Sequence, residues 1–247
     1  MTGRLALVLV FPVLALAPVA TLAQAPLEQA RALLERYHED PARIDRAREL
    51  LETELARERA VPTMVALART YFLVGDIRAT TTDDKLAAYD RGRELGQRAV
   101  ELAPRNEEAH VWYAINTGRW GQTKGVMRSL FLLPTIRKEL DIIFELNPRS
   151  IRGHALAGNV FFEVPGLLGG DRKKAEEHYR KALEIDPRYT VVRVDLARLL
   201  IATGRTAEAR RELTRVIDER APFDLAGWTL KDVPRARRLL DSIKDTP

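Results

Sequence analysis

A short phrase ending in proline recurs along this chain and limits the folds open to it. The phrase reads AVELAP at residues 99–104, IFELNP at 143–148 and ALEIDP at 182–187, and a further proline stands at 222. The intervals between these prolines are 44, 39 and 35 residues. Units of about 34 residues closed by a proline are typical of paired antiparallel helices in tandem. One unit cannot bury its apolar face alone, so neighbouring units must stack into a curved solenoid with a concave surface.

The unit that ends near Pro222 shows the pattern most clearly. Its apolar and small residues fall on one face of two helices with a period of 3.6 residues. They are Leu196, Ala197 and Leu200 in the first helix, and Ala209, Leu213 and Val216 in the second. Gly204 stands between the helices, and we expect it to take a positive φ. In the preceding unit we expect Asp171 to cap the second helix.

We therefore predict an all-α fold, a right-handed superhelical solenoid of antiparallel helix pairs. Residues 26–247 are expected to form one domain. Its parts are a helical pair at 26–59, repeats at approximately 62–104, 105–148, 149–187 and 188–222, and a capping helix at 232–244. The cap is amphipathic and would cover the last apolar face. The composition, 46% hydrophobic and 30% charged, agrees with amphipathic helices rather than disorder.

Two units carry more residues between their helices than a turn needs. The longer insertion spans 122–134, and a shorter one spans 163–170. Two interpretations of the longer insertion stay open. It adds helical turns that pack on the bundle, or it forms a lip that binds a ligand or partner. The candidate residues of such a lip are Trp112, Arg119, Trp120, Lys124 and Phe131.

Residues 1–25 have the features of an export signal. Arg4 precedes an apolar run from Leu5 to Val19, and the residues AQA at 23–25 match a small-x-small cleavage site. A retained membrane anchor is the competing interpretation. Pro12 and Pro18 inside the run favour cleavage. We expect a periplasmic protein of residues 26–247, with no stable membrane anchor after cleavage.

The charge pattern points away from nucleic acid. The net charge is +5, but the basic residues often stand beside acidic ones along the helix faces, which indicates solvated surfaces. Weak attraction to acidic partners or to anionic lipid headgroups is the alternative. The chain has no cysteine, so it has neither disulfides nor thiol chemistry.

No group of residues matches a catalytic or metal-binding pattern. His110 and His154 each stand six residues after a repeat-closing proline, which predicts a packing role. His178 lacks the second histidine that a helical zinc site needs four residues away. The segment 166–171, GLLGGD, lacks the Gly-Lys-Ser/Thr ending of a phosphate loop. We therefore predict a protein that is not an enzyme and that holds neither metal nor cofactor.

The register of the first helix in each repeat predicts which residues face the concave surface. These are Arg69, Phe72, Val111, Ile115, Asn159, Phe162, Val194 and Arg198. Apolar residues mixed with arginine and asparagine suit a partner that has both apolar and anionic or amide groups.

From residue 62 to about 222 the chain resembles the tetratricopeptide superfamily. More narrowly, it resembles the periplasmic T-component proteins of tripartite (TRAP) transporters. The residues that carry this resemblance are Trp112–Ala114, Gly118, Glu145–Pro148, Gly169–Asp171 and Lys174–Ala175. The resemblance implies a non-enzymatic homo-oligomer, a trimer, that pairs with the solute-binding protein of a transporter. The chain departs from those proteins in having no cysteine for lipid attachment.

Two functions follow as hypotheses. The first is an exported scaffold that binds a protein or peptide through its concave face. The alternative is a transporter accessory that binds a small molecule or the solute-binding protein. The alternative predicts a pocket lined by the rings of Trp112, Trp120, Phe131 and Phe162.

Overall fold

The structure, a computed structural model, describes residues 20–245, and 81% of these residues are helical. Among these residues there is no β-strand, so the predicted all-helical fold is confirmed. The expected export signal at 1–25 falls on residues outside the described range, except for the first six residues of helix α1. No helix in the described part is both long and apolar enough to cross a membrane.

The main helices pair in chain order. They are α1 (Ala20–Glu35), α2 (Ala42–Arg57), α3 (Val61–Leu73), α4 (Thr82–Leu102), α5 (Glu107–Lys124), α6 (Val126–Leu146), α7 (Ile151–Glu163), α8 (Arg172–Ile185), α9 (Thr190–Ala202), α10 (Thr206–Asp218), the single turn α11 (Leu225–Gly227) and α12 (Val233–Ser242). Three irregular turns join them: the π-helical turns η1 (Val74–Arg78) and η3 (Trp228–Asp232), and the 3-10 turn η2 (Gly166–Leu168).

Local signals set several helix ends. Thr81, Asn106 and Ser150 each accept a hydrogen bond from a backbone N–H in the first turn of the helix that follows. Asp171 caps α8 in the same way, as predicted. Gly204 has φ +76° between α9 and α10, which confirms the expected left-handed turn.

The long insertion is helical. Instead of forming a loop, residues 122–134 lengthen α5 to Lys124 and begin α6 at Val126, with Gly125 alone between the two helices. Gly125 has φ +114°, a conformation that residues with a side chain rarely adopt, so the chain reverses within one residue. The interpretation as additional helical turns therefore describes this segment.

A recurring hydrogen bond ties the first helix of three repeats to the proline that closes the preceding repeat. The side chain six residues after that proline bonds the proline carbonyl oxygen: His110 Nε2 to Pro104 at 2.9 Å, His154 Nε2 to Pro148 at 3.1 Å and Arg193 Nη2 to Pro187 at 2.7 Å. The same three side chains reach the second helix of their repeat. Their partners there are Glu139 at 2.5 Å, His178 at 2.9 Å and Glu212 at 2.6 Å. The two histidines thus have a structural role, because each joins the two helices of its repeat and the proline that closes the preceding repeat.

The core is divided. One apolar cluster, the N-terminal cluster, lies mainly in α1–α5, and another, the C-terminal cluster, lies in α7–α12. A small third cluster around Ile136, Leu140 and Ala157 is formed by α6 and α7. Residues 232–243 cover the second cluster through Ala236, Leu239 and Ile243.

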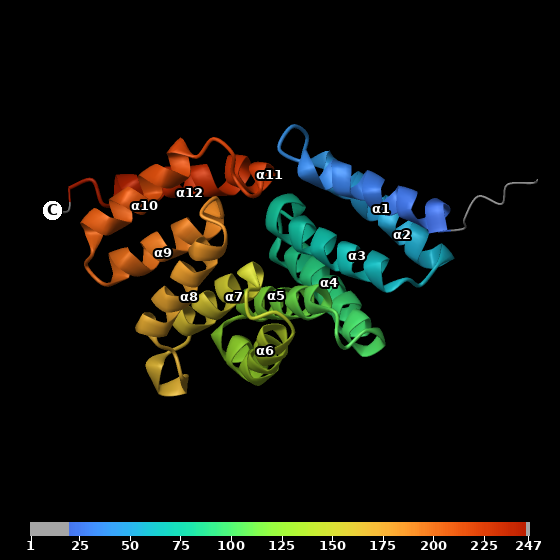
Figure 1. Ribbon diagram of the computed structural model, residues 1–247, viewed down its shortest axis with the longest axis horizontal. Helices are drawn as coiled ribbons and strands as arrows, with labels where there is room; N and C mark the ends of the chain where they lie inside the picture. Colours follow the sequence, from blue (N-terminus) through green and yellow to red (C-terminus); the bar gives the residue numbers. More distant parts are fainter. Residues whose placement is uncertain (1–19, 246–247) are drawn as a thin grey trace, which may run out of the picture.

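The C-terminal segment also reaches the opposite end of the molecule. Ala226 belongs to the N-terminal cluster, and Leu230 packs against it. Figure 1 shows α11 beside α1, so the row of helix pairs curves until its two ends meet. The solenoid is closed on itself around its concave side.

Candidate functional site

A cavity of about 720 Å³ lies on the concave side, between the two main apolar clusters. Its walls come from η1, the first helix of three successive pairs (α5, α7, α9), the first half of α6, and the closing segment η3–α12. Because Phe72 of α3 and Asp76 of η1 line it together with Lys231 of η3 and Arg235 of α12, the cavity exists only in the closed arrangement. Its volume is within the range typical of ligand pockets.

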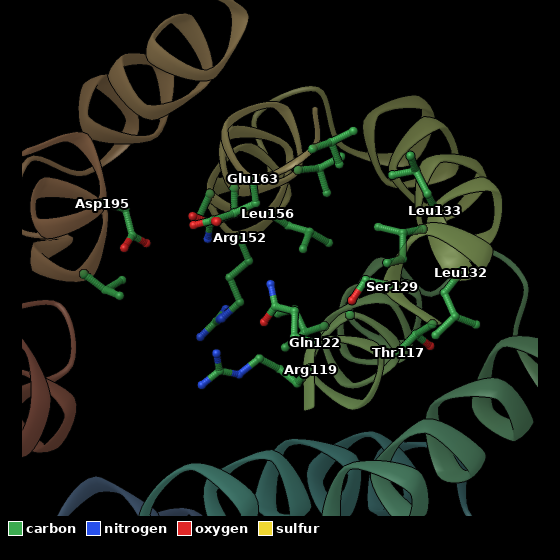
Figure 2. Close-up of a pocket in the computed structure, with 18 of the residues that line it drawn as sticks. Thr117, Arg119, Gln122, Ser129, Leu132, Leu133, Arg152, Leu156, Glu163 and Asp195 are labelled. Atoms are coloured by element: carbon green, nitrogen blue, oxygen red, sulfur yellow. The ribbon is translucent and has the colours of Figure 1, made fainter. Parts of the chain in front are cut away.

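The two sides of the cavity differ in chemistry. Figure 2 shows the charged side chains of Arg119, Arg152, Glu163 and Asp195 on one side and Leu132 and Leu133 on the other. The apolar wall continues with Val126, Leu130, Ile136, Leu156 and Val160. The lining contains five cationic side chains and three carboxylates, so its net charge is positive.

Asp76 is the centre of the first charged group. Its side chain is only 2% exposed and forms ion pairs with Arg119 and Lys231. The Tyr89 hydroxyl donates a hydrogen bond of 3.0 Å to the same carboxylate. Burial alone would raise the pKa of Asp76, but the charges of Arg119 and Lys231 hold it well below its usual range. Asp76 is therefore ionised, and its ion pairs hold α5 and η3 to η1.

Asp195 is the centre of the second charged group. Arg235 donates to it at 2.9 Å, and Arg198 lies 3.7 Å from it while donating to Glu163 at 2.9 Å. Close by, Thr190 donates at 2.7 Å to Asp232, and burial raises the pKa of Asp232 to about 6. These bonds join α7, α9 and α12 along the rim of the cavity.

Two arginines lack comparable partners. Arg152 lies over the rings of Trp112 and Phe223, 5.7 Å from each ring centroid. Its ion pair is with the exposed Glu108, at an N–O distance of 3.8 Å. Arg69 has no ion pair within residues 20–245. Burial and the neighbouring charge of Arg152 lower the pKa of Arg69. Among the cations of the cavity lining, Arg152 is the one whose nearest carboxylate in the described part of the chain is farthest away.

The predicted concave residues divide into three groups. Phe72, Ile115, Asn159 and Arg198 line the cavity, as does Arg119 from the predicted lip. Arg69 and Phe162 are half-buried outside the lining, and Phe162 lies under Arg198 at 5.5 Å.

Val111 and Val194 are not on the concave surface, because they are 2% and 0% exposed. Each lies one turn before a residue that does line the cavity, Ile115 and Arg198 respectively.

The four rings of the alternative hypothesis do not come together. Trp112 is buried in the N-terminal cluster, with its centroid 5.7 Å from the ring of Phe72. Trp120 contacts Arg93, Lys124 and Arg128 outside the cavity lining, and Phe131 is 73% exposed. Phe162 packs against the C-terminal cluster. The prediction of a pocket lined by these four rings is therefore wrong.

Sequence reasoning missed Asp76, Lys231, Arg152, Asp195 and Arg235. Asp76 stands in a polar stretch of the sequence, but the π-helical turn continues α3 and buries it. Asp195 had a local signal, because it is the one acidic residue in the apolar run of α9. The others had none, since their partners are 40 or more residues away.

Comparison with known proteins places the chain in a family. The sequence profile described as Regulator of microtubule dynamics protein 1-3 matches residues 26–176. The chain belongs to this family. A tetratricopeptide repeat profile matches residues 167–232, which confirms the repeat assignment. The narrower resemblance to TRAP T-components finds no support in these matches.

Among the relatives in this family, Regulator of microtubule dynamics protein 3 of Mus musculus is 24% identical over 196 residues. The match covers 70% of this chain and 42% of the mouse protein. Regulator of microtubule dynamics protein 2 of Mus musculus is 30% identical over 109 residues, 44% of this chain and 26% of that protein. The chain thus spans less than half the length of the relatives it matches.

A solved structure shares the fold. The crystal structure of a thermophilic tetratricopeptide-repeat protein of Thermus thermophilus superposes with a TM-score of 0.66. It covers 90% of this chain and 99% of its own, at 23% sequence identity. This likeness confirms the helical-repeat fold and carries nothing about ligands.

Proposed function

We propose that the chain is an exported, non-enzymatic scaffold that binds a segment of a protein partner in its central cavity. One observation carries the proposal: the cavity combines a leucine-rich wall with a charged wall whose cations outnumber its carboxylates. A segment that presents an acidic group beside apolar side chains would match both walls. The repeat fold supports the same role, because tandem helix pairs form extended concave binding surfaces.

Export to the periplasm is part of the proposal and depends on residues 1–25 alone. The relatives are named for regulating microtubule dynamics. What we carry over from them is the shared repeat scaffold, because the match leaves more than half of each relative uncovered. A transporter accessory role is the weaker proposal, since its ring-lined pocket does not form and its family resemblance lacks support.

Arg152 gives the sharpest test of partner binding. A peptide library displayed on phage and selected on the purified chain should enrich sequences that combine acidic and apolar residues. Arg152→Glu should weaken an enriched peptide about tenfold or more, because it puts a negative charge where the cavity is positive. The matched control is Arg149→Glu, an exposed arginine three residues away whose side chain has no ion pair within the described residues. Binding that is unaffected by Arg152→Glu would contradict the cavity as the site.

A further inference from the structure

The hairpin of α5 and α6 exposes apolar side chains at its tip. Val126 is 73% exposed, Met127 68% and Phe131 73%, and all three lie in the first turns of α6. Met127 and Phe131 are four residues apart and so share one helix face. The 3-10 turn η2 adds the exposed Leu167 and Leu168. It lies beside α6, because Arg137 of α6 donates a hydrogen bond of 2.8 Å to the Leu168 carbonyl oxygen. Five of the eight exposed large apolar residues in the described part of the chain lie in these two places.

Positive charge surrounds this tip. Lys124 and Arg128 lie over the ring of Trp120 at 5.7 and 5.8 Å, and Arg93 lies over it at 5.0 Å. From residue 109 to residue 138 the chain has five lysines and arginines and no acidic residue, although it has 35 acidic residues in all. The tip therefore combines protruding apolar side chains, a half-buried tryptophan and positively charged side chains.

We propose that this tip surface, made of Val126, Met127 and Phe131 with Lys124 and Arg128, docks onto an anionic lipid bilayer. Helices with an apolar face and lysine or arginine beside it bind in the headgroup region by inserting the apolar face and attracting anionic lipid. Each cation near such a surface adds to the attraction. Tryptophan is favoured at this depth because its ring is apolar and its N–H is polar.

The charge pattern favours lipid over a second copy of the chain. In a symmetric dimer through this surface, the same patch of each subunit would face the other, so Lys124 and Arg128 would meet like charges. The shape favours lipid over a protein partner, because Met127 and Phe131 protrude from a helix end and lie outside the cavity lining. The docking is peripheral and requires no membrane-spanning helix.

The absence of cysteine from the chain makes a local test straightforward. The variant Met127→Cys of the full chain would be labelled with an environment-sensitive fluorophore. It would then be mixed with phosphatidylcholine vesicles that contain or lack phosphatidylglycerol. We expect the emission to shift to shorter wavelength with the anionic vesicles and to stay unchanged with the neutral ones. The control label is Arg237→Cys on α12, which should stay silent with both. Because the fluorophore reports its own surroundings, attachment through another part of the chain also leaves it silent.

Charge reversal separates docking from misfolding. Lys124→Glu with Arg128→Glu should weaken the response of the Met127→Cys label about 30-fold or more, because two attractive charges become repulsive. Arg237→Glu with Arg238→Glu is the matched control and should leave it unchanged. Far-UV circular dichroism of both double variants checks that they are folded. A silent label, an equal response to neutral vesicles, or a shift that depends on protein concentration without vesicles would each overturn the proposal.

Discussion

At the scale of single residues, the buried carboxylate of Asp76 holds three elements of the fold together. It is almost fully covered, yet it meets two cations and a phenol from other helices. A buried charge is tolerated when it is paired and hydrogen-bonded, and removing one partner leaves the others uncompensated.

Asp76→Ala should therefore lower the free energy of unfolding by about 3–5 kcal/mol, because Arg119 and Lys231 lose their shared anion. Urea unfolding followed by circular dichroism measures this change. Asp83→Ala, an exposed aspartate in the first turn of α4, should change stability by less than about 1 kcal/mol. Since the pKa of Asp76 lies below its usual range, its contribution should be complete above about pH 4 and lost only below that. A loss of stability no larger than that of Asp83→Ala would contradict this role.

The pair His154 and His178 predicts a response to mild acid. Their Nδ1 atoms are 2.9 Å apart, and His178 stacks on Phe144 and Phe161. Burial, the neighbouring His154 and two lysines lower the pKa of His178 to about 4. The folded state thus binds this proton less readily than the unfolded state. Stability should be complete above about pH 6.5 and fall as the pH drops toward 4, by an amount on the order of 2 kcal/mol.

The His178→Phe variant isolates this contribution, because phenylalanine keeps the ring contacts and cannot be protonated. Free energies of unfolding measured between pH 7 and pH 4 should fall less for the variant than for the unmodified chain. The difference between the two curves is the informative quantity, because Asp232, with its pKa raised to about 6, stabilises the fold as the pH drops. Parallel curves would show that His178 does not titrate as inferred.

At the scale of elements, small residues decide how closely α4 and α5 approach. A Cβ atom built on Gly96 would lie 2.7 Å from the Tyr113 Cα atom, and one on Gly92 would lie 2.5 Å from the Asn116 side chain. The two glycines of α4 thus allow α5 to approach closely. Backbone atoms of α5 cannot yield without moving the helix.

Gly96→Ala should therefore destabilise the fold by about 1–3 kcal/mol through overpacking. Gly118→Ala is the matched control on α5, because its new Cβ atom would meet nothing closer than Ile136 Cδ1 at 3.6 Å. That variant should be neutral or stabilising by up to about 1 kcal/mol, since alanine favours the helix over glycine. Thermal unfolding of both variants, followed by circular dichroism, makes the comparison. Equal effects would mean that α4 and α5 are free to separate.

At the scale of the whole molecule, closure of the solenoid is the property that creates the cavity. Lys231 joins η3 to Asp76 across 155 residues of sequence, and Leu230 packs on the N-terminal cluster. These contacts hold the first and last helix pairs together. Without them the concave side would be open, as in a solenoid with separated ends.

Leu230→Ser combined with Lys231→Glu should release this closure. We expect a larger radius of gyration by small-angle X-ray scattering and faster amide exchange in α1–α3, because the segment that covers them becomes free to move. Thr229→Glu, an exposed neighbour, is the control and should leave both unchanged. Far-UV circular dichroism should show that the helices persist. An unchanged scattering profile in the double variant would contradict the closing role of η3.

Features that depend on neighbours along the chain could be predicted from residue patterns. The spacing of apolar residues indicated paired helices, the proline phrases indicated the repeats, and Gly204 and Asp171 indicated a turn and a cap. The first-helix register also identified Phe72, Ile115, Asn159 and Arg198, because residues four apart on one helix share a face.

Which distant residues meet depends on the arrangement of the helix pairs in space. The pairing of Asp76 with Lys231, the position of Arg152 and the burial of Val111 and Val194 depend on how far the row of helix pairs curves. That curvature is the sum of small rotations between neighbouring pairs, and no local pattern records the sum. The helices could therefore be predicted from the sequence, whereas the closed ring and the charged cavity inside it could not.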